Sequence, residues 1–117
     1  MSTSFRVWHN PRCSKSRAAL SFLRDRGMEP EIFDYMNVDL RVDDLAQVLG
    51  LLRYQPRELL RSKEAVCREL GLSASDTKDS AILAAMVEHR RLIERPIVIH
   101  GGRAVVARPT ERIDELL

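Results

Sequence analysis

The alternation of apolar and polar residues predicts that strands and helices alternate in the first third of the chain. Residues 5–9 alternate in polarity and are rich in aromatic and β-branched side chains, which predicts a short strand. Apolar residues then recur at helical spacing over about 14–26, and Gly27 stands where helices commonly end. Residues 31–35 predict a second strand. This order predicts a βαβ unit with parallel strands and a right-handed crossover.

The middle of the chain predicts helices alone. The expected helices cover 42–49, ended by Gly50; 56–60, with Pro56 in the first turn; 62–70, with Ser62 as N-cap; and 78 to about 90, capped by Asp76 or Thr77. Cys67 falls on the apolar side of the third of these helices, so we expect it to be buried and unreactive.

The last part of the chain returns to strands. Residues 97–100 and 103–107 are β-rich runs joined by Gly101-Gly102, which predicts a hairpin. Pro109 then opens a final helix. Its expected apolar side holds Ile113, Leu116 and Leu117. The whole order predicts an α/β domain in a thioredoxin-like arrangement, with a βαβ unit, a ββα unit and a helical insertion between them.

Length and composition fit one domain over residues 1–117, with 44% hydrophobic residues for its core. A formal net charge of +2 predicts no binding to nucleic acid or to a membrane surface, and the longest apolar run, 81–87, is too short for a bilayer. Residues 1–4 show no secretory signal. Two cysteines without such a signal indicate a reducing cytoplasm, so we expect a cytoplasmic monomer without a structural disulfide.

The loop over residues 9–17 carries the strongest chemical signal. It follows the first strand, at the sheet edge where α/β proteins bind ligands. Cys13 directly precedes the helix, beside free backbone N–H groups and the positive end of the helix dipole, and Arg12, Lys15 and Arg17 add positive charge. These features predict a lowered pKa and a reactive thiolate at Cys13. The alternative is a buried cysteine that packs as a small apolar residue.

Other candidates are weaker when each is taken alone. Arg95 and Arg108 each precede a proline at an expected element boundary, which places both at loop junctions. Pro96 fits the first position of a strand, where no N–H is needed. His9 ends the first strand, where it can make a local hydrogen bond. The other histidines do not stand at metal-ligand spacing from cysteines or carboxylates, so we expect no metal site.

Four motifs together resemble the glutaredoxin-dependent arsenate reductases, and the resemblance extends over residues 5–117. The motifs are His-Asn-Pro-Arg-Cys-Ser-Lys-Ser-Arg at 9–17, Arg-Glu-Leu-Leu-Arg at 57–61, Glu-Arg-Pro-Ile-Val at 94–98 and Ala-Arg-Pro-Thr-Glu at 107–111. Each motif alone would be weak, and the signal comes from their order and spacing.

The resemblance implies a reaction and a set of residues. Cys13 would attack arsenate, and Arg61, Arg95 and Arg108 would hold this phosphate-like anion. Guanidinium groups suit that role because they stay charged and can bind two oxygens at once. They also weaken the repulsion between two approaching anions, the thiolate and arsenate.

The resemblance also implies supporting roles and co-substrates. His9, if protonated, would lower the pKa of Cys13 by its charge, and Pro96 would be cis and face the cysteine. Ser16 stands where a thioredoxin CxxC motif has its second cysteine, so no local disulfide can form and an external thiol must act as reductant. The family uses glutathione as co-substrate and glutaredoxin as partner, with no bound cofactor.

Two other functions stay open at this point. Regulators with a similar fold bind RNA polymerase and sense oxidation through a CxxC pair, which Ser16 removes here. The second open function is that of a glutathione-dependent thiol reductase that has no preference for arsenate. Members of that branch tend to lack part of the arginine set, which this chain retains.

Overall fold

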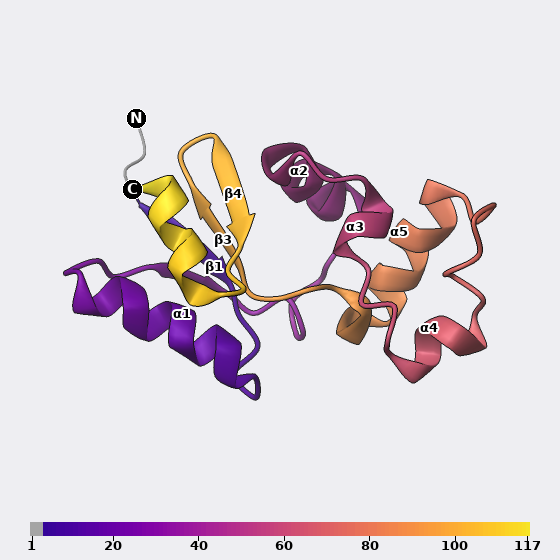
Figure 1. Ribbon diagram of the computed structural model, residues 1–117, viewed down its shortest axis with the longest axis horizontal. Helices are drawn as coiled ribbons and strands as arrows, with labels where there is room; N and C mark the ends of the chain where they lie inside the picture. The colour runs from indigo at the N-terminus through magenta and orange to yellow at the C-terminus, as the bar shows by residue number, and fades with distance from the viewer. Residues whose placement is uncertain (1–3) are drawn as a thin grey trace. The chain divides into compact units, whose positions relative to one another are not determined.

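The computed structural model of the chain describes residues 4–117 (Figure 1). Residues 1–3 lie outside the described residues, and the expectation of no secretory signal in residues 1–4 falls mostly on them. The chain divides into two compact units, one made of the residues up to 39 together with 95–117, the other of 40–94. The single domain expected from the length stays a prediction.

The first unit is built on a four-stranded sheet with the strand order β2-β1-β3-β4 (Figure 1). Its elements are β1 (Phe5–Trp8), α1 (Ser14–Asp25), β2 (Glu31–Phe33), β3 (Ile97–His100), β4 (Arg103–Val106) and the 3-10 helix η2 (Thr110–Leu116). β1 is parallel to β2, whereas β3 is antiparallel to both β1 and β4. The βαβ unit, the hairpin and the α/β class predicted from the sequence are therefore confirmed.

α1 and η2 pack together against one face of this sheet (Figure 1). Val7, Leu23, Val98 and Ile113 are fully buried in the layer between them. Each side chain removed from water in this way stabilises the fold by about 1.5–3 kcal/mol. The packing holds the N-terminus of α1 close to the carboxyl end of β1, because only a short turn joins the two elements.

Two element ends in this unit differ from the sequence prediction. β2 ends at Phe33, not at residue 35, because the Asp34 carboxylate accepts hydrogen bonds from the residues that follow it and turns the chain. Leu117 is 57% exposed, although it was expected on the buried side of the last helix. The reason is the 3-10 geometry of η2, in which residues three apart share a face, so Ile113 and Leu116 are buried and Leu117 is not.

The second unit contains only helices. They are α2 (Val42–Leu52), α3 (Pro56–Leu59), α4 (Ala65–Glu69), α5 (Asp79–Glu88) and the 3-10 helix η1 (Arg90–Leu92). α2 was expected to end at Gly50 but continues to Leu52 and is capped by Arg53 with a left-handed φ of 59°. Burial of Leu52 outweighs the cost of about 1 kcal/mol of a glycine inside a helix.

Two expected helix caps are also corrected by the structure. Glu64, not Ser62, is the N-cap of α4, because residues 61–64 form a turn that precedes the helix. Lys78 is the N-cap of α5, because the Thr77 hydroxyl instead donates a hydrogen bond to the Gly71 carbonyl at 3.2 Å. None of the helices in residues 4–117 has both the length and the apolar character that a membrane span requires.

Candidate active site

The loop before α1 is held by hydrogen bonds that start from Asn10. Its carbonyl oxygen accepts the Cys13 N–H at 2.9 Å, and its side-chain oxygen accepts the Arg12 N–H at 3.0 Å. The Asn10 N–H in turn donates to the hydroxyl of Ser16, which is fully buried, at 3.3 Å. The Arg17 guanidinium donates to the Pro11 carbonyl at 3.0 Å. Ser16 and Arg17, both expected as supporting residues, thus fix the shape of the loop.

This loop places Cys13 at the N-cap position of α1, with an extended backbone. Its side chain makes no capping hydrogen bond to the described residues. It nevertheless lies near the unpaired N–H groups of the first turn, those of Ser16 and Lys15. Burial raises the pKa of the thiol, but the N–H groups of Ser16 and Lys15 and the charge and hydrogen bond of Arg95 lower it more. The net effect is a lowered pKa, as the sequence predicts, so the folded chain favours the thiolate.

Arg95 is the site residue that only the fold could bring to Cys13. It follows the second unit in sequence and lies just before β3, next to β1 in the sheet. The Arg95–Pro96 peptide bond is cis, as the resemblance implies, while the expectation that Pro96 faces the cysteine stays a prediction. The Arg108–Pro109 bond is also cis, which the sequence did not suggest. Arg108 itself is exposed at the end of β4.

His9 is buried at the end of β1, with 8% of its surface exposed. Burial lowers its pKa, the charge of Asp34 opposes this, and the charges of Arg24 and Arg17 lower the pKa further. The lowered pKa disfavours the protonated ring that a charge effect on the thiol would need. Among the described residues its Nδ1 has no hydrogen-bond partner, whereas its backbone N–H donates to the Phe33 carbonyl at 2.9 Å. The supporting role expected for His9 at Cys13 stays a prediction.

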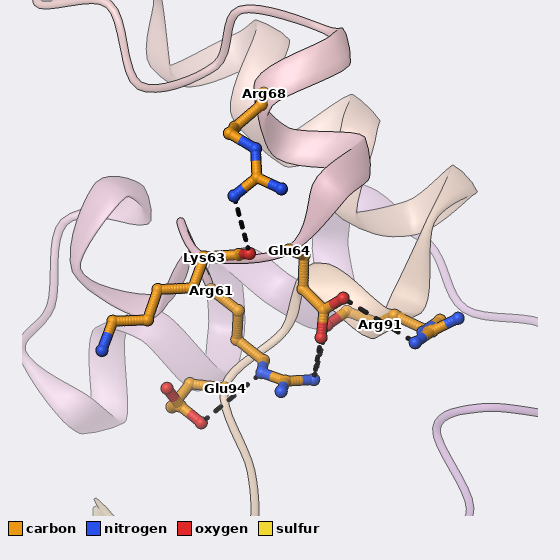
Figure 2. A network of polar contacts seen from close by, with 6 residues as sticks. All are labelled: Arg61, Lys63, Glu64, Arg68, Arg91 and Glu94. Atoms are coloured by element: carbon orange, nitrogen blue, oxygen red, sulfur yellow. Dashed lines mark hydrogen bonds and ion pairs between the residues drawn. The ribbon is translucent and has the colours of Figure 1, made fainter.

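Arg61 belongs to the second unit and is held by carboxylates (Figure 2). Its Nη1 lies 2.9 Å from Glu64 Oε1 and donates to the Arg91 carbonyl at 3.1 Å. Its Nε lies 4.0 Å from Glu94 Oε1. Sequence reasoning did not identify these acidic partners, although the spacing of Arg61 and Glu64 (three residues) is a known signal for an ion pair.

The second cysteine lies in a different environment from Cys13. Cys67 is fully buried, as predicted, with its Sγ 3.5 Å from the Ser73 hydroxyl. Both cysteines are free. Within residues 4–117 no cluster of histidine, cysteine and acidic side chains is arranged to hold a metal ion. The candidate site of the first unit therefore consists of the Cys13 thiol, with its lowered pKa, and the Arg95 guanidinium beside it.

The lowered pKa of Cys13 predicts selective alkylation. At pH 7 and under native conditions, iodoacetamide should modify Cys13 at least about tenfold faster than Cys67, since the thiolate is the nucleophile and Cys67 is buried. The rate at Cys13 should fall as the pH drops through its lowered pKa. Mass spectrometry of peptides after timed quenching measures both rates. Equal labelling, or a Cys13 rate that rises only at the pH typical of free cysteine, would contradict this assignment.

A sheet of thioredoxin type with a thiolate-forming cysteine at the N-terminus of its first helix defines a class of thiol-dependent proteins. A family model described as the ArsC family matches residues 8–116. The chain belongs to this ArsC family.

Individual relatives match over nearly their whole length. An arsenate reductase of Neisseria meningitidis serogroup B is 40% identical over 113 residues, covering 96% of this chain and 97% of the relative. The uncharacterized protein YfgD of Escherichia coli K12 is 39% identical over 120 residues, a match that covers 100% of this chain and 99% of YfgD. The solved structure of an arsenate reductase from Vibrio cholerae superposes with a TM-score of 0.94 at 39% identity, covering 100% of both chains.

Proposed function

We propose that this protein is an arsenate reductase that uses the Cys13 thiolate as nucleophile. The observation that carries the proposal is the environment of Cys13, where the N–H groups of Ser16 and Lys15 and the Arg95 guanidinium favour the charged thiolate. The same donors favour a bound oxyanion. The names of relatives that are 40% identical over 96% of the chain support arsenate as that oxyanion.

The proposed reaction has three steps. The Cys13 thiolate attacks the As(V) atom, and an arsenate oxygen leaves as water, which forms an arsenic–sulfur bond. The thiolate of glutathione then attacks Cys13 Sγ, the sulfur–arsenic bond breaks, and its electron pair leaves with arsenic as As(III), or arsenite. The two sulfurs, each oxidised by one electron, form a mixed disulfide, which a glutaredoxin thiol clears by exchange.

Three arginines have a proposed role in holding the oxyanion. Arg95 acts beside the thiol, whose pKa its charge lowers. Arg108 and Arg61 are assigned by their motifs, Arg108 in the first unit and Arg61 in the second. Their guanidinium groups neutralise the charge of arsenate, so that a second anion, the thiolate, can approach.

The residue at position 16 supports reduction by external thiols. Ser16 is buried and cannot form a disulfide with Cys13, so in the proposed reaction each turnover takes two thiols from outside the chain. We expect arsenate-dependent oxidation of NADPH in a coupled assay with glutathione, glutathione reductase and a glutaredoxin, and at least about a tenfold drop when glutaredoxin is omitted. Arsenite formed is measured in the same samples.

The alternative functions predict different results in this assay and in a pull-down with the tagged chain. Reduction of disulfide substrates at a rate that arsenate does not match would indicate a general thiol reductase. Recovery of RNA polymerase with the tagged chain, together with no arsenite formed, would indicate a regulator. Arsenite formation that needs a dithiol protein and not glutathione would contradict the proposed reductant while leaving the arsenate chemistry in place.

A further inference from the structure

The Arg61 side chain is part of a network of two acidic and two basic residues in the second unit (Figure 2). Glu64 connects the network, because its Oε1 lies 2.9 Å from Arg61 Nη1 and its Oε2 lies 3.8 Å from Arg91 Nη2. Glu94 approaches Arg61 Nε at 4.0 Å. Arg61 and Glu64 are 24% and 19% exposed, so solvent screens their interaction less than it does at the open surface.

The backbone around this network is held in place on both sides. The Arg61 N–H donates to the Leu92 carbonyl at 2.7 Å, and the Glu94 N–H donates to Leu59 at 2.9 Å. The Glu64 N–H donates to the Arg61 carbonyl at 3.1 Å, which closes the turn before α4. These hydrogen bonds fix the backbone of Glu64 relative to the backbone of Arg61, so the Glu64 carboxylate is held close to the Arg61 guanidinium.

The hydrogen bonds leave one side of the Arg61 guanidinium open. Nη1 has two N–H groups, and these face Glu64 Oε1 and the Arg91 carbonyl. Figure 2 draws no hydrogen bond or ion pair to Nη2 from the residues shown. A guanidinium whose orientation is set through Nη1 can thus present Nη2 to an incoming oxygen.

We infer that Glu64 is a positioning residue that sets the affinity of Arg61 for an oxyanion. The inference rests on the proposed function, in which Arg61 binds arsenate. Glu64 has two opposing effects. It orients the guanidinium, which favours binding, and its negative charge compensates part of the positive charge of Arg61, which disfavours binding and speeds release of the anion.

These two effects can be separated by substitution. Glu64→Gln keeps an oxygen that accepts from Arg61 Nη1 but removes the charge, so arsenate should bind about threefold more tightly at low salt. Glu64→Ala removes both, and the freed guanidinium should bind about fivefold more weakly because it must be ordered on binding. Glu64→Asp keeps the charge but shortens the side chain, and should also weaken binding. A residue with only a structural role would not shift affinity in opposite directions in Gln and Ala.

The experiment is titration of arsenate by calorimetry into the full chain and its variants, with circular dichroism to verify folding. Glu69→Gln is the matched control, since Glu69 is an exposed carboxylate at the C-terminal end of α4, the helix that Glu64 precedes as N-cap. Its Kd should equal that of the wild type. The gain in Glu64→Gln should shrink at 0.5 M salt because the charge effect is screened.

The outcomes distinguish this inference from the reductase proposal. Equal Kd values for wild type, Glu64→Gln and Glu64→Asp, or a shift of all Glu64 variants in one direction, would overturn the inference even if turnover is normal. A wild-type chain that binds no arsenate would overturn it as well. Arsenate binding with the expected pattern but without arsenite formation would sustain the inference and contradict the reductase proposal.

Discussion

Replacing Cys13 with serine is expected to abolish arsenite formation, a loss of at least about a thousandfold in turnover. The hydroxyl of serine stays protonated near neutral pH, even beside the N–H groups that favour the Cys13 thiolate. An oxygen in this position also cannot form the mixed disulfide with glutathione, and in the proposed reaction arsenic is reduced in the step that forms this disulfide. The coupled NADPH assay with direct measurement of arsenite tests both parts of this expectation.

Cys67→Ser is the matched control for this variant. Cys67 is fully buried in the second unit, and its sulfur lies near the Ser73 hydroxyl, which can serve as a partner for the new oxygen. We expect normal turnover and a loss of stability of about 1–3 kcal/mol from burying a hydroxyl. Thermal unfolding measures the second effect. Turnover retained in Cys13→Ser but lost in Cys67→Ser would show that the nucleophile is misassigned.

Replacing Arg95 with alanine should lower kcat/KM for arsenate by about a hundredfold, because the variant loses two effects at once. The charge and hydrogen bond of Arg95 lower the pKa of Cys13, so without them the thiol is protonated over a wider pH range. The variant also loses a guanidinium that the proposed mechanism uses to bind the oxyanion. The activity of Arg95→Ala should recover partly as the pH rises, since a larger fraction of Cys13 is then ionised.

The pH profile of iodoacetamide alkylation isolates the effect on the thiol. In Arg95→Ala the rise of the rate with pH should move to higher pH, whereas Arg95→Lys should keep most of the wild-type profile because it keeps the charge. Arg103→Ala is the control, since Arg103 is an exposed arginine at the start of β4, outside the residues that shift the pKa of Cys13. An alkylation profile of Arg95→Ala that matches the wild type would contradict the role assigned to Arg95 at the thiol.

The strands and helices of the first unit could be predicted because their signals are local. The alternation over residues 5–9, the glycine after α1 and the two-glycine turn of the hairpin each act over a few residues, and the structure confirms all three elements. The errors fall where local signals compete. Gly50 favours a helix end, but burial of Leu52 continues α2. The expected cap at Ser62 is replaced by a turn over residues 61–64, and the Thr77 hydroxyl donates to the Gly71 carbonyl instead of capping α5.

Part of the site could be predicted for the same reason. Cys13 and the first N–H groups of α1 are neighbours in sequence, so the lowered pKa of the thiol follows from a short stretch of chain. The lowered pKa of His9 could not be predicted, because it depends on burial and on charges from Asp34 and Arg24. The ion pair between Glu94 and Arg61 could not be predicted either, because the two residues lie far apart in the sequence.

The sequence by itself determined the order of the elements and a cysteine at the N-terminus of a helix, because periodicity and capping act between residues close in the chain. Tertiary structure decided that Arg95 lies beside Cys13, that burial lowers the pKa of His9, and that carboxylates hold Arg61. Coulomb interactions and desolvation depend on distances in space, and for segments far apart in sequence only the packed fold determines those distances.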